Sequence, residues 1–293
     1  MKLRNPYYEV LCTYFKRSEY QLRSMPTRPE YIRQFLRWKR RPATPPVCSY
    51  AGPEKLTVIL LSYRRIRNME PLVANLLHTD FVAKVIVSNN NPEYRIGEWI
   101  RLRDPRLHLI DQPQRTPAGI RFELARHEPG PYFLSIDDDV LLHPEQVLRL
   151  FEHLVADPSV PHGFQGEEYN PDHPRLWDVA LRGEREVDNL NCLYAFHKDH
   201  VIEMERLAGE LGIDLGGLAN GEDILVSAGG TGRPRIHDLG EVLICLSSHR
   251  AGVATWRSRR GFFHERQELF GKLRELKPLL GPGPRPSAEA QAS

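Results

Sequence analysis

Between residues 55 and 157, short apolar runs alternate with amphipathic stretches, and this alternation is the strongest constraint on the fold. Three runs are almost continuously apolar: KLTVILLSY (55–63), AKVIVSNN (83–90) and PYFLSID (131–137). Such runs are typical of strands buried on both faces of a parallel sheet. RLHLIDQ (106–112) predicts a further strand. Helices are expected over 68–78, within 116–128 and over 143–157.

Strands that alternate with helices predict an α/β fold, because each crossover helix covers one face of a parallel sheet. We expect a Rossmann-like half and a second half in one continuous domain, residues 53–278; the resemblance given below implies that the second half binds the acceptor. The second half, from residue 160, is more irregular, with strand candidates near 163–168, 192–196 and 241–246. Residues 1–52 predict a basic arm with short helices, and residues 279–293 a disordered tail.

Polar residues stand at the carboxyl ends of three predicted strands, which is where ligands bind in such sheets. They are SYRR (62–65), SNNN (88–91) and DDD (137–139). Three adjacent carboxylates repel one another by roughly 4 kcal/mol per pair at about 4 Å and an effective dielectric near 20. We therefore expect a cation among them. The structural alternative is a solvated Asp-rich turn that caps the helix starting near Pro144.

Several phosphate-binding and hydrolytic motifs are absent from the sequence. The first strand is followed by no GxGxxG turn, and neither a Walker A motif nor a GxSxG elbow occurs. A divalent metal held by carboxylate oxygens remains as a way to bind a diphosphate, and Mn²⁺ or Mg²⁺ suits such ligands.

The segment SIDDDVLL (135–142) resembles the DxD segment of GT-A nucleotide-sugar glycosyltransferases, and more closely that of exostosin-type enzymes (glycosyltransferase family 64). The likeness covers about residues 55–278 and continues in order through TVILLSYRR (57–65), KVIVSNNNPE (84–93), GIRF (119–122), DPSVPHGFQGEEY (157–169), NGEDILVSAGGTG (220–232) and HERQELFGKLRELKPL (264–279). Two positions depart from the family pattern: Ile120 stands where that family tends to have Asn, and Gly221 where it has Cys.

The resemblance implies a role for each matching residue. It implies a donor-binding set that consists of Ser62, Tyr63, Arg65, Asn90, Arg121, Asp137 and Asp138. It further implies that Asp139 ligates the metal, with His249 as a candidate additional ligand. Asp223 would lie beneath the anomeric carbon of the donor sugar, and Arg266 would brace the leaving diphosphate.

The implied function is a metal-dependent transfer of a sugar from a UDP-sugar, an N-acetylhexosamine with retention, to a glycan or glycolipid. Two alternatives stay open. GED (221–223) also resembles the base motif of inverting family-2 enzymes, and a non-catalytic glycan-binding protein could use the same fold. A nucleotidyltransferase is disfavoured, because the loop after the first strand lacks the glycines that would cradle phosphates.

Charge and cysteine usage bear on partners and compartment. Residues 1–50 carry a surplus of eight positive charges, so the body carries six net negative charges. An acidic body argues against a nucleic-acid partner, whereas the arm could contact an anionic membrane. The four cysteines are widely spaced, and the sequence shows neither a signal-peptide pattern nor a long apolar window. We expect a cytoplasmic protein, with contact to the inner face of a membrane through the arm as an option.

Overall fold

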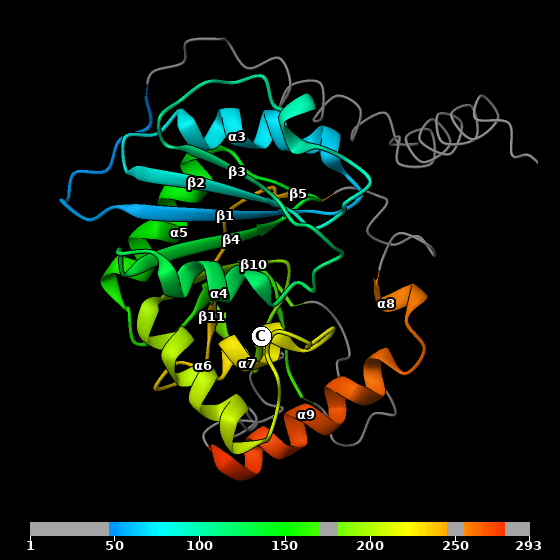
Figure 1. Cartoon of the computed structure of the whole chain (residues 1–293). Helices are drawn as coiled ribbons and strands as arrows, with labels where there is room; N and C mark the ends of the chain where they lie inside the picture. The colour runs from blue at the N-terminus through cyan, green and yellow to red at the C-terminus, as the bar shows by residue number, and fades with distance from the viewer. Residues whose placement is uncertain (1–46, 170–180, 245–254, 279–293) are drawn as a thin grey trace, which may run out of the picture.

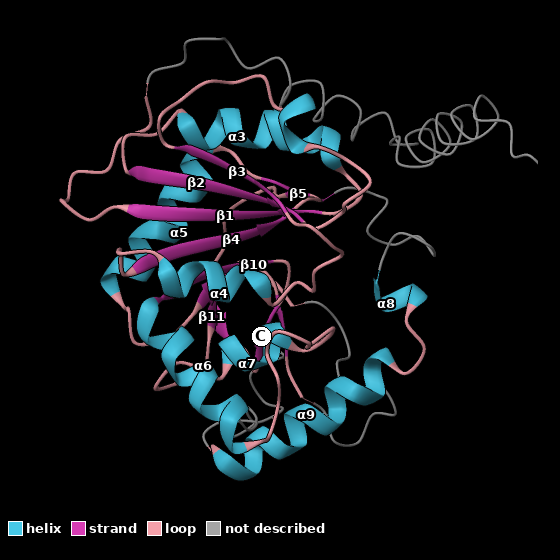
Figure 2. Cartoon of the chain, viewed as in Figure 1, coloured by secondary structure: helices cyan, strands magenta, loops and turns pink. Residues whose placement is uncertain are grey.

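An eight-stranded mixed sheet with helices on both faces organises the protein (Figures 1 and 2). The computed structural model describes residues 47–169, 181–244 and 255–278. The expected arm (to residue 46), the tail and His249 lie outside these ranges. In sheet order the strands are β3 (Leu107–Asp111), β2 (Val82–Asn89), β1 (Leu56–Ser62), β4 (Tyr132–Asp137), β10 (Leu193–His197), β6 (His162–Gly163), β11 (Arg235–Ile236) and β8 (Arg185–Glu186).

The first four strands in this order are parallel, as the continuous apolar runs predict. All seven residues of β1 are buried, because β1 pairs with β2 on one side and β4 on the other and is covered on both faces. Leu60 pairs with Val87 of β2 and with Ile136 of β4. A strand in this central position has no face for polar side chains.

The order β3-β2-β1-β4 creates a switch point, because the chain leaves β1 toward β2 and later returns to β1's other side as β4. The carboxyl ends of the parallel strands meet at one edge of the sheet. Ser62, Asn89, Asp111 and Asp137 are the last residues of these strands. In open α/β sheets the crevice at a switch point is where ligands bind.

Helices cover the two faces and divide the core into two hydrophobic clusters. Val58 and Leu60 of β1 point to the face covered by α3 and α5, whereas Ile59 and Leu61 point to the face covered by α4, α6, α7 and α9. The α-helices are α3 (Met69–Leu77), α4 (Ile120–His127), α5 (Pro144–Ala156), α6 (Lys198–Glu210), α7 (Glu222–Ser227), α8 (Thr255–Ser258) and α9 (Phe262–Leu276). Two 3₁₀ turns are η1 (Ile66–Asn68) and η2 (Ile96–Glu98).

The second half of the chain packs beside β4 through β10, which runs antiparallel to it. Leu193 pairs with Ile136, so the start of β10 lies next to the carboxyl end of β4. Cys192, directly before β10, adopts a left-handed conformation with φ of 64° and accepts a hydrogen bond from the amide of Asp137 at 3.1 Å. This turn brings the second half of the chain to the switch point.

Two small two-stranded sheets complete the fold. They pair β5 (Val140–Leu141) with β12 (Leu243–Ile244), and β7 (Gly166–Glu167) with β9 (Asn189–Leu190). Among the described residues, no helix has the length and apolar character needed to cross a bilayer. The prediction of a mixed α/β fold with a large sheet, consistent with a GT-A architecture, is confirmed.

Candidate active site

The loop after β1 is built around the carboxylate of Asp138. Its Oδ2 accepts hydrogen bonds from the backbone N–H groups of Tyr63, Arg64 and Arg65, with N···O distances of 3.2, 3.3 and 3.1 Å. Its Oδ1 accepts a hydrogen bond from Nη1 of Arg65 at 2.6 Å. The side-chain amide of Asn68 donates to the carbonyl of Asp138 at 2.7 Å. Through these contacts the carboxylate of Asp138 fixes the β1 loop at the switch point.

Arginine side chains neutralise the three adjacent aspartates. Besides Asp138, Arg65 reaches Oδ2 of Asp139 at 3.2 Å, and Arg121 pairs with Oδ1 of Asp137 at 2.7 Å. The positive charge expected among the aspartates is thus supplied in part by arginines of the protein itself. Charge repulsion alone therefore does not require a metal at this site, and the metal has to be argued from the oxygen ligands.

Arg121 is a buried residue whose guanidinium is fully engaged. It is 2% exposed; its Nε donates to the carbonyl of Ala118 and its Nη1 to Oγ of Ser135, both at 3.1 Å. Burial opposes its charge, but Asp137 raises the pKa of Arg121 above its ordinary value. Arg121 is therefore not a solvated surface side chain. In this conformation Arg121 orients Asp137, whose side chain remains 31% exposed.

Two arginines lie near the ring of Tyr63. The guanidinium groups of Arg115 and Arg64 lie 4.9 and 5.2 Å from its centroid. The side chain of Asn91 donates to the carbonyl of Tyr63 at 3.0 Å. Neither Arg115 nor Asn91 was assigned a role from the sequence. Asn91 had a signal in the run of three asparagines, whereas Arg115 stands in a loop without any.

Two of the expected donor-binding residues face the interior. Ser62 is fully buried, and its carbonyl accepts the amide of Asn90 at 2.8 Å. The side-chain oxygen of Asn90 accepts the hydroxyl of Ser88 at 2.8 Å. Ser62 and Asn90 therefore stabilise the ends of β1 and β2, and they offer little surface to a ligand in this conformation.

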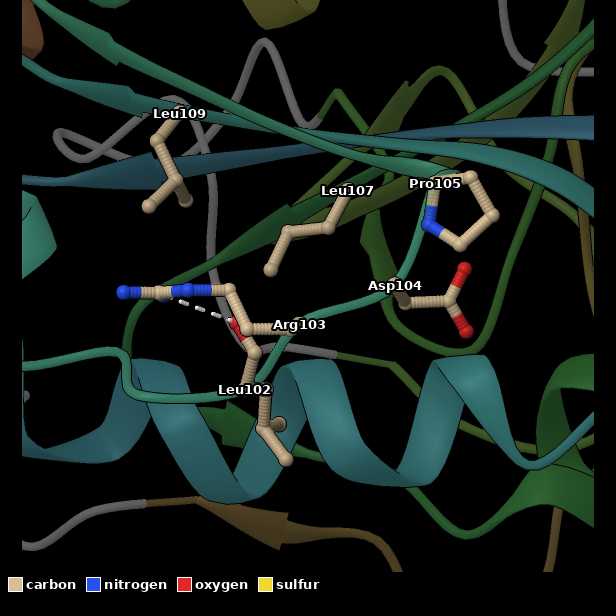
Figure 3. A pocket seen from close by; sticks show the side chains of 6 residues that line it. All are labelled: Leu102, Arg103, Asp104, Pro105, Leu107 and Leu109. Atoms are coloured by element: carbon tan, nitrogen blue, oxygen red, sulfur yellow. Dashed lines mark hydrogen bonds between the residues drawn. The ribbon is translucent and has the colours of Figure 1, made fainter.

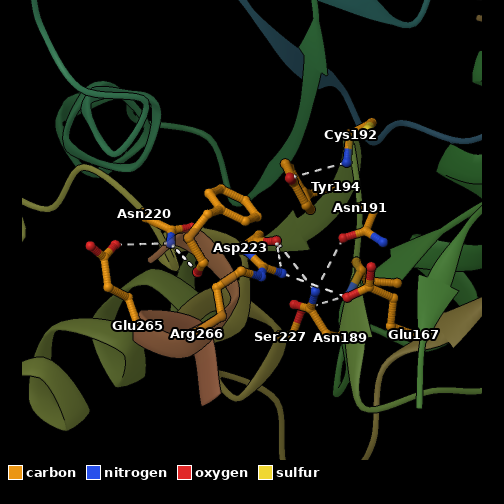
Figure 4. A network of polar contacts seen from close by, with 12 residues as sticks. Glu167, Asn189, Asn191, Cys192, Tyr194, Asn220, Asp223, Ser227, Glu265 and Arg266 are labelled. Carbon is orange, nitrogen blue, oxygen red and sulfur yellow. Dashed lines mark hydrogen bonds and ion pairs between the residues drawn. The ribbon is translucent and has the colours of Figure 1, made fainter. Parts of the chain in front are cut away.

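Asp223 and Arg266 form a buried bidentate ion pair (Figure 4). Nη1 and Nη2 of Arg266 donate to Oδ1 and Oδ2 of Asp223, each at 2.7 Å. The two residues are 6% and 5% exposed. Asp223 lies in the first turn of α7, and Arg266 lies on α9. Burial opposes the charge of Arg266, but Asp223 raises the pKa of the guanidinium.

Further polar groups surround this pair (Figure 4). The amide of Asn189 donates to Asp223 at 3.3 Å, and its oxygen accepts the hydroxyl of Ser227 at 3.2 Å. Glu167 lies 3.7 Å from Arg266, and burial raises the pKa of its carboxyl group, with Asp223 acting in the same direction. Sequence reasoning missed Glu167, because only the pairing of β7 with β9 brings it to the ion pair.

Glu222 precedes Asp223 and is only half-buried. Burial raises the pKa of Glu222 to about 7, and the negative charge of Asp223 acts in the same direction. The preceding residue, Gly221, has φ of 98°, and a Cβ there would lie 2.5 Å from Cδ2 of Leu269. The left-handed backbone therefore favours glycine at this position, where the exostosin-type pattern has Cys.

Cys192 and Tyr194 lie between the two groups of charged residues. Burial raises the pKa of the Cys192 thiol, and the charges of Asp137, Asp139 and Asp223 act in the same direction. The ring of Tyr194 lies 5.2 Å from the guanidinium carbon of Arg121. The aspartate run and the Asp223–Arg266 pair therefore belong to one region around the start of β10.

The donor set at this edge suits a hard divalent cation. Asp137 and Asp139 bring carboxylate oxygens to the carboxyl end of β4, and Mg²⁺ or Mn²⁺ takes one or two carboxylates together with water and phosphate oxygens. The residues present thus fit a metal that is shared with a phosphorylated ligand.

A separate open hollow of about 380 Å³ lies beside the edge strand β3 (Figure 3). Its lining consists of Leu102, Arg103, Asp104, Pro105, Leu107 and Leu109. It begins at the loop that enters β3, so it lies toward the amino end of that strand. None of the residues expected to bind the donor lines it, and it is not part of the candidate active site.

The doubly wound sheet, with aspartates and an arginine-rich loop at its switch point, is consistent with a GT-A glycosyltransferase fold. Residues 57–195, just under half of the chain, match the sequence model of glycosyl transferase family 2. The family match and the fold support a GT-A glycosyltransferase, and the exostosin-type resemblance is not confirmed.

Among solved structures, the chain is similar to the crystal structure of GalNAc-T7 with UDP, GalNAc and Mn²⁺, at 12% sequence identity and a TM-score of 0.45. That likeness covers 64% of this chain and 42% of the other. No curated protein matches the sequence.

Proposed function

We propose that the protein is a metal-dependent glycosyltransferase that moves a sugar, an N-acetylhexosamine, from a UDP-sugar to a glycan or glycolipid acceptor. The observation that carries this proposal is the meeting of the Tyr63–Arg65 loop with Asp137–Asp139 at the β1–β4 switch point. This region lies inside the segment that matches glycosyl transferase family 2.

The first group of residues holds the nucleotide. The ring of Tyr63 offers an aromatic surface for the uracil, and Arg64 and Arg115 lie beside it. Asp137 keeps an exposed carboxylate edge for hydroxyl groups of the ribose or sugar. Asp138 uses both of its oxygens on the β1 loop, so we assign it a positioning role.

Asp139 would hold Mn²⁺ or Mg²⁺, which when bound supplies positive charge to the leaving diphosphate. Arg65 bridges Asp138 and Asp139 and so holds the carboxylate of Asp139 beside the β1 loop. His249 remains the proposed additional ligand. The strand that precedes it, β12, pairs with β5, where Ile244 lies opposite Val140.

The Asp223–Arg266 pair acts on the two sides of the scissile bond, Asp223 on the sugar and Arg266 on the diphosphate. Cleavage between the anomeric carbon and the diphosphate builds positive charge on the sugar and negative charge on the leaving group. Asp223 stabilises the first and Arg266 the second. Both oxygens of Asp223 accept hydrogen bonds from Arg266, which orients the carboxylate for stabilising charge on the sugar. This favours retention, as the exostosin-type resemblance implies.

Inversion is the second candidate outcome, and the properties of Glu222 favour it. A general base works best when its pKa lies near the working pH, and the pKa of Glu222 is raised to about 7. The match to glycosyl transferase family 2 agrees with this alternative. Glu222 would then take the proton of the acceptor hydroxyl.

Thermal unfolding against UDP-GlcNAc, UDP-Glc, UDP-Gal and GDP-Man, each with Mn²⁺ or EDTA, tests the donor site. We expect one UDP-sugar to raise the melting temperature only with Mn²⁺, because a ligand of the native state stabilises it. Asp139→Ala should abolish the shift, and Asp199→Ala, at an exposed position of α6, should retain it. If no nucleotide sugar shifts the wild type, the proposal fails.

Turnover separates the remaining alternatives. Release of UDP with an acceptor present distinguishes a transferase from a glycan-binding protein. The anomeric configuration of the product, determined by NMR, distinguishes retention from inversion. Contact of the basic arm (1–52) with an anionic membrane stays a prediction, supported by its charge surplus and tested by co-sedimentation with anionic vesicles.

A further inference from the structure

Three histidines and a glutamate from distant parts of the chain meet outside the candidate active site. His153 lies in the last turn of α5, His162 on β6, Glu184 just before β8, and His237 directly after β11. The rings of His153 and His237 stack with centroids 3.6 Å apart and an interplanar angle of 10°. His162 and His237 are buried.

Two of the rings form a hydrogen-bonded chain that runs from a carbonyl to a carboxylate. Nε2 of His162 lies 2.7 Å from the carbonyl oxygen of Asp157. Nδ1 of His162 lies 2.8 Å from Nε2 of His237. Nδ1 of His237 lies 2.9 Å from Oε2 of Glu184.

With both histidines neutral, this row of hydrogen-bonded groups is one hydrogen short, so one positive charge, a proton or a metal ion, is missing from it. Each of its three contacts needs one hydrogen, and the carbonyl of Asp157 and the carboxylate of Glu184 are acceptors only. A neutral imidazole carries one N–H, so His162 and His237 supply two hydrogens. The carbonyl requires the N–H of His162 at Nε2, and His162 then requires the N–H of His237 at Nε2. Nδ1 of His237 is left as a lone pair that faces the Glu184 carboxylate.

We propose that this cluster binds a divalent transition-metal ion such as Zn²⁺ through Nδ1 of His237, the carboxylate of Glu184 and a ring nitrogen of His153. The candidate ligand atoms all lie within 4.8 Å of one another. The His237–Glu184 distance of 2.9 Å is close to the roughly 3.3 Å that separates two ligands of a tetrahedral zinc with bonds of about 2.0 Å.

The other histidine contact matches the second shell of a zinc site. A metal-bound histidine donates its remaining N–H to a fixed acceptor, and His237 donates Nε2–H to His162, which the carbonyl of Asp157 holds in place. Two imidazoles and one carboxylate suit zinc, whereas the all-oxygen set of the aspartates suits Mg²⁺ or Mn²⁺.

The position of His153 indicates that the missing positive charge is a metal ion and not a proton. A proton between His237 and Glu184 would need no third ligand, yet a third imidazole lies directly against the contact. Coordination requires His153 to tilt out of the stack, because a metal in the plane of one ring lies outside the plane of a parallel ring. His153 is half-buried, and among the described residues no hydrogen bond holds its ring.

The site is built to join structural elements. α5 begins beyond the carboxyl end of β4 and packs against the sheet, so His153 lies roughly 13 Å along the helix from that end at 1.5 Å per residue. A metal here would tie the end of α5 to the segments that lead into β8 and out of β11.

The test uses the full-length protein, stripped with a chelator and kept in excess Mg²⁺ so that oxygen-ligand sites are occupied. Zn²⁺ is titrated by calorimetry, and Co²⁺ by its visible absorption bands. We expect one equivalent of Zn²⁺ to bind the wild type and raise its melting temperature. Glu184→Gln and His153→Gln should each weaken binding at least about tenfold.

Matched controls keep the result specific. Glu184 and its neighbour Glu186 are both exposed, so their variants should fold, and Glu186→Gln should bind Zn²⁺ as the wild type does. His264→Gln, at an exposed position of α9, is the control for His153→Gln. The proposal is overturned if the wild type binds no Zn²⁺, or if Glu184→Gln and His153→Gln bind it unchanged.

Discussion

The buried ion pair between Asp223 and Arg266 should make a large and asymmetric contribution to stability. Removing one partner of a buried pair leaves an uncompensated charge and typically costs about 3–5 kcal/mol. Asp223→Asn leaves Arg266 with Glu167, whose carboxylate lies 3.7 Å away. Arg266→Met leaves both Asp223 and Glu167 without their cation. The loss should therefore be larger for Arg266→Met.

We expect Asp223→Asn to cost about 3 kcal/mol and Arg266→Met about 4–5 kcal/mol, the two ends of that range. In a domain of this size, 1 kcal/mol corresponds to roughly 2–4 °C in melting temperature. Arg266→Met should then unfold roughly 8–20 °C below the wild type. Guanidinium unfolding at pH 7 measures both losses, and the double variant measures the coupling between the two sites.

An exposed pair on α6 supplies the control. Arg206 contacts Glu203 through two hydrogen bonds of 2.7 and 2.8 Å, so its geometry matches the buried pair but its side chain is 51% exposed. Solvent screens such pairs, and Arg206→Met should leave stability unchanged. The reasoning is refuted if the buried variants lose no more stability than Arg206→Met, or if Asp223→Asn loses more than Arg266→Met.

Three further predictions concern single residues around the site. Gly221→Ala should lower the free energy of unfolding by about 1–2 kcal/mol, because φ at this position is 98°. Gly209→Ala, within α6 and with open space around it, is the control and should stabilise the protein by up to about 1 kcal/mol. Chemical denaturation measures both changes. The pKa of Glu222 is raised from 4.5 to about 7, so the folded state holds its proton more tightly than the unfolded state. Its stabilising contribution is present below pH 4.5 and is lost as the pH rises to 7, and the denaturation midpoint of Glu222→Gln should lack this decline. Asp138→Ala removes the acceptor of three amides, so hydrogen exchange at residues 63–65 should be at least about tenfold faster than in the wild type, and an unchanged rate would contradict the anchoring role.

The sequence predicted the parallel half of the sheet and its polar edge. A strand covered on both faces is mostly apolar, so LTVILLS and its partners are recognisable without any tertiary information. The carboxyl ends of parallel strands lie together by topology, and this placed Tyr63–Arg65 beside Asp137–Asp139 before any contact was known.

The second half was less predictable, for two different reasons. α6 was not recognised, although Val201, Met204 and Leu207 repeat at helical spacing and are buried on one face. That signal was available and was overlooked. The two-residue strands β5, β8 and β9 gave no comparable signal, because two residues span only one period of the strand alternation.

Side-chain partnerships depended on the tertiary structure alone. The bidentate contact of Asp223 with Arg266 spans 43 positions, and the single side-chain contact of Arg65 with Asp138 spans 73. The stacked rings of His153 and His237 come from segments that carry no shared motif. Local patterns report burial and periodicity, which each segment carries by itself. Which charged groups meet is decided by strand order and by the turn at Cys192, and these exist only once the chain has folded.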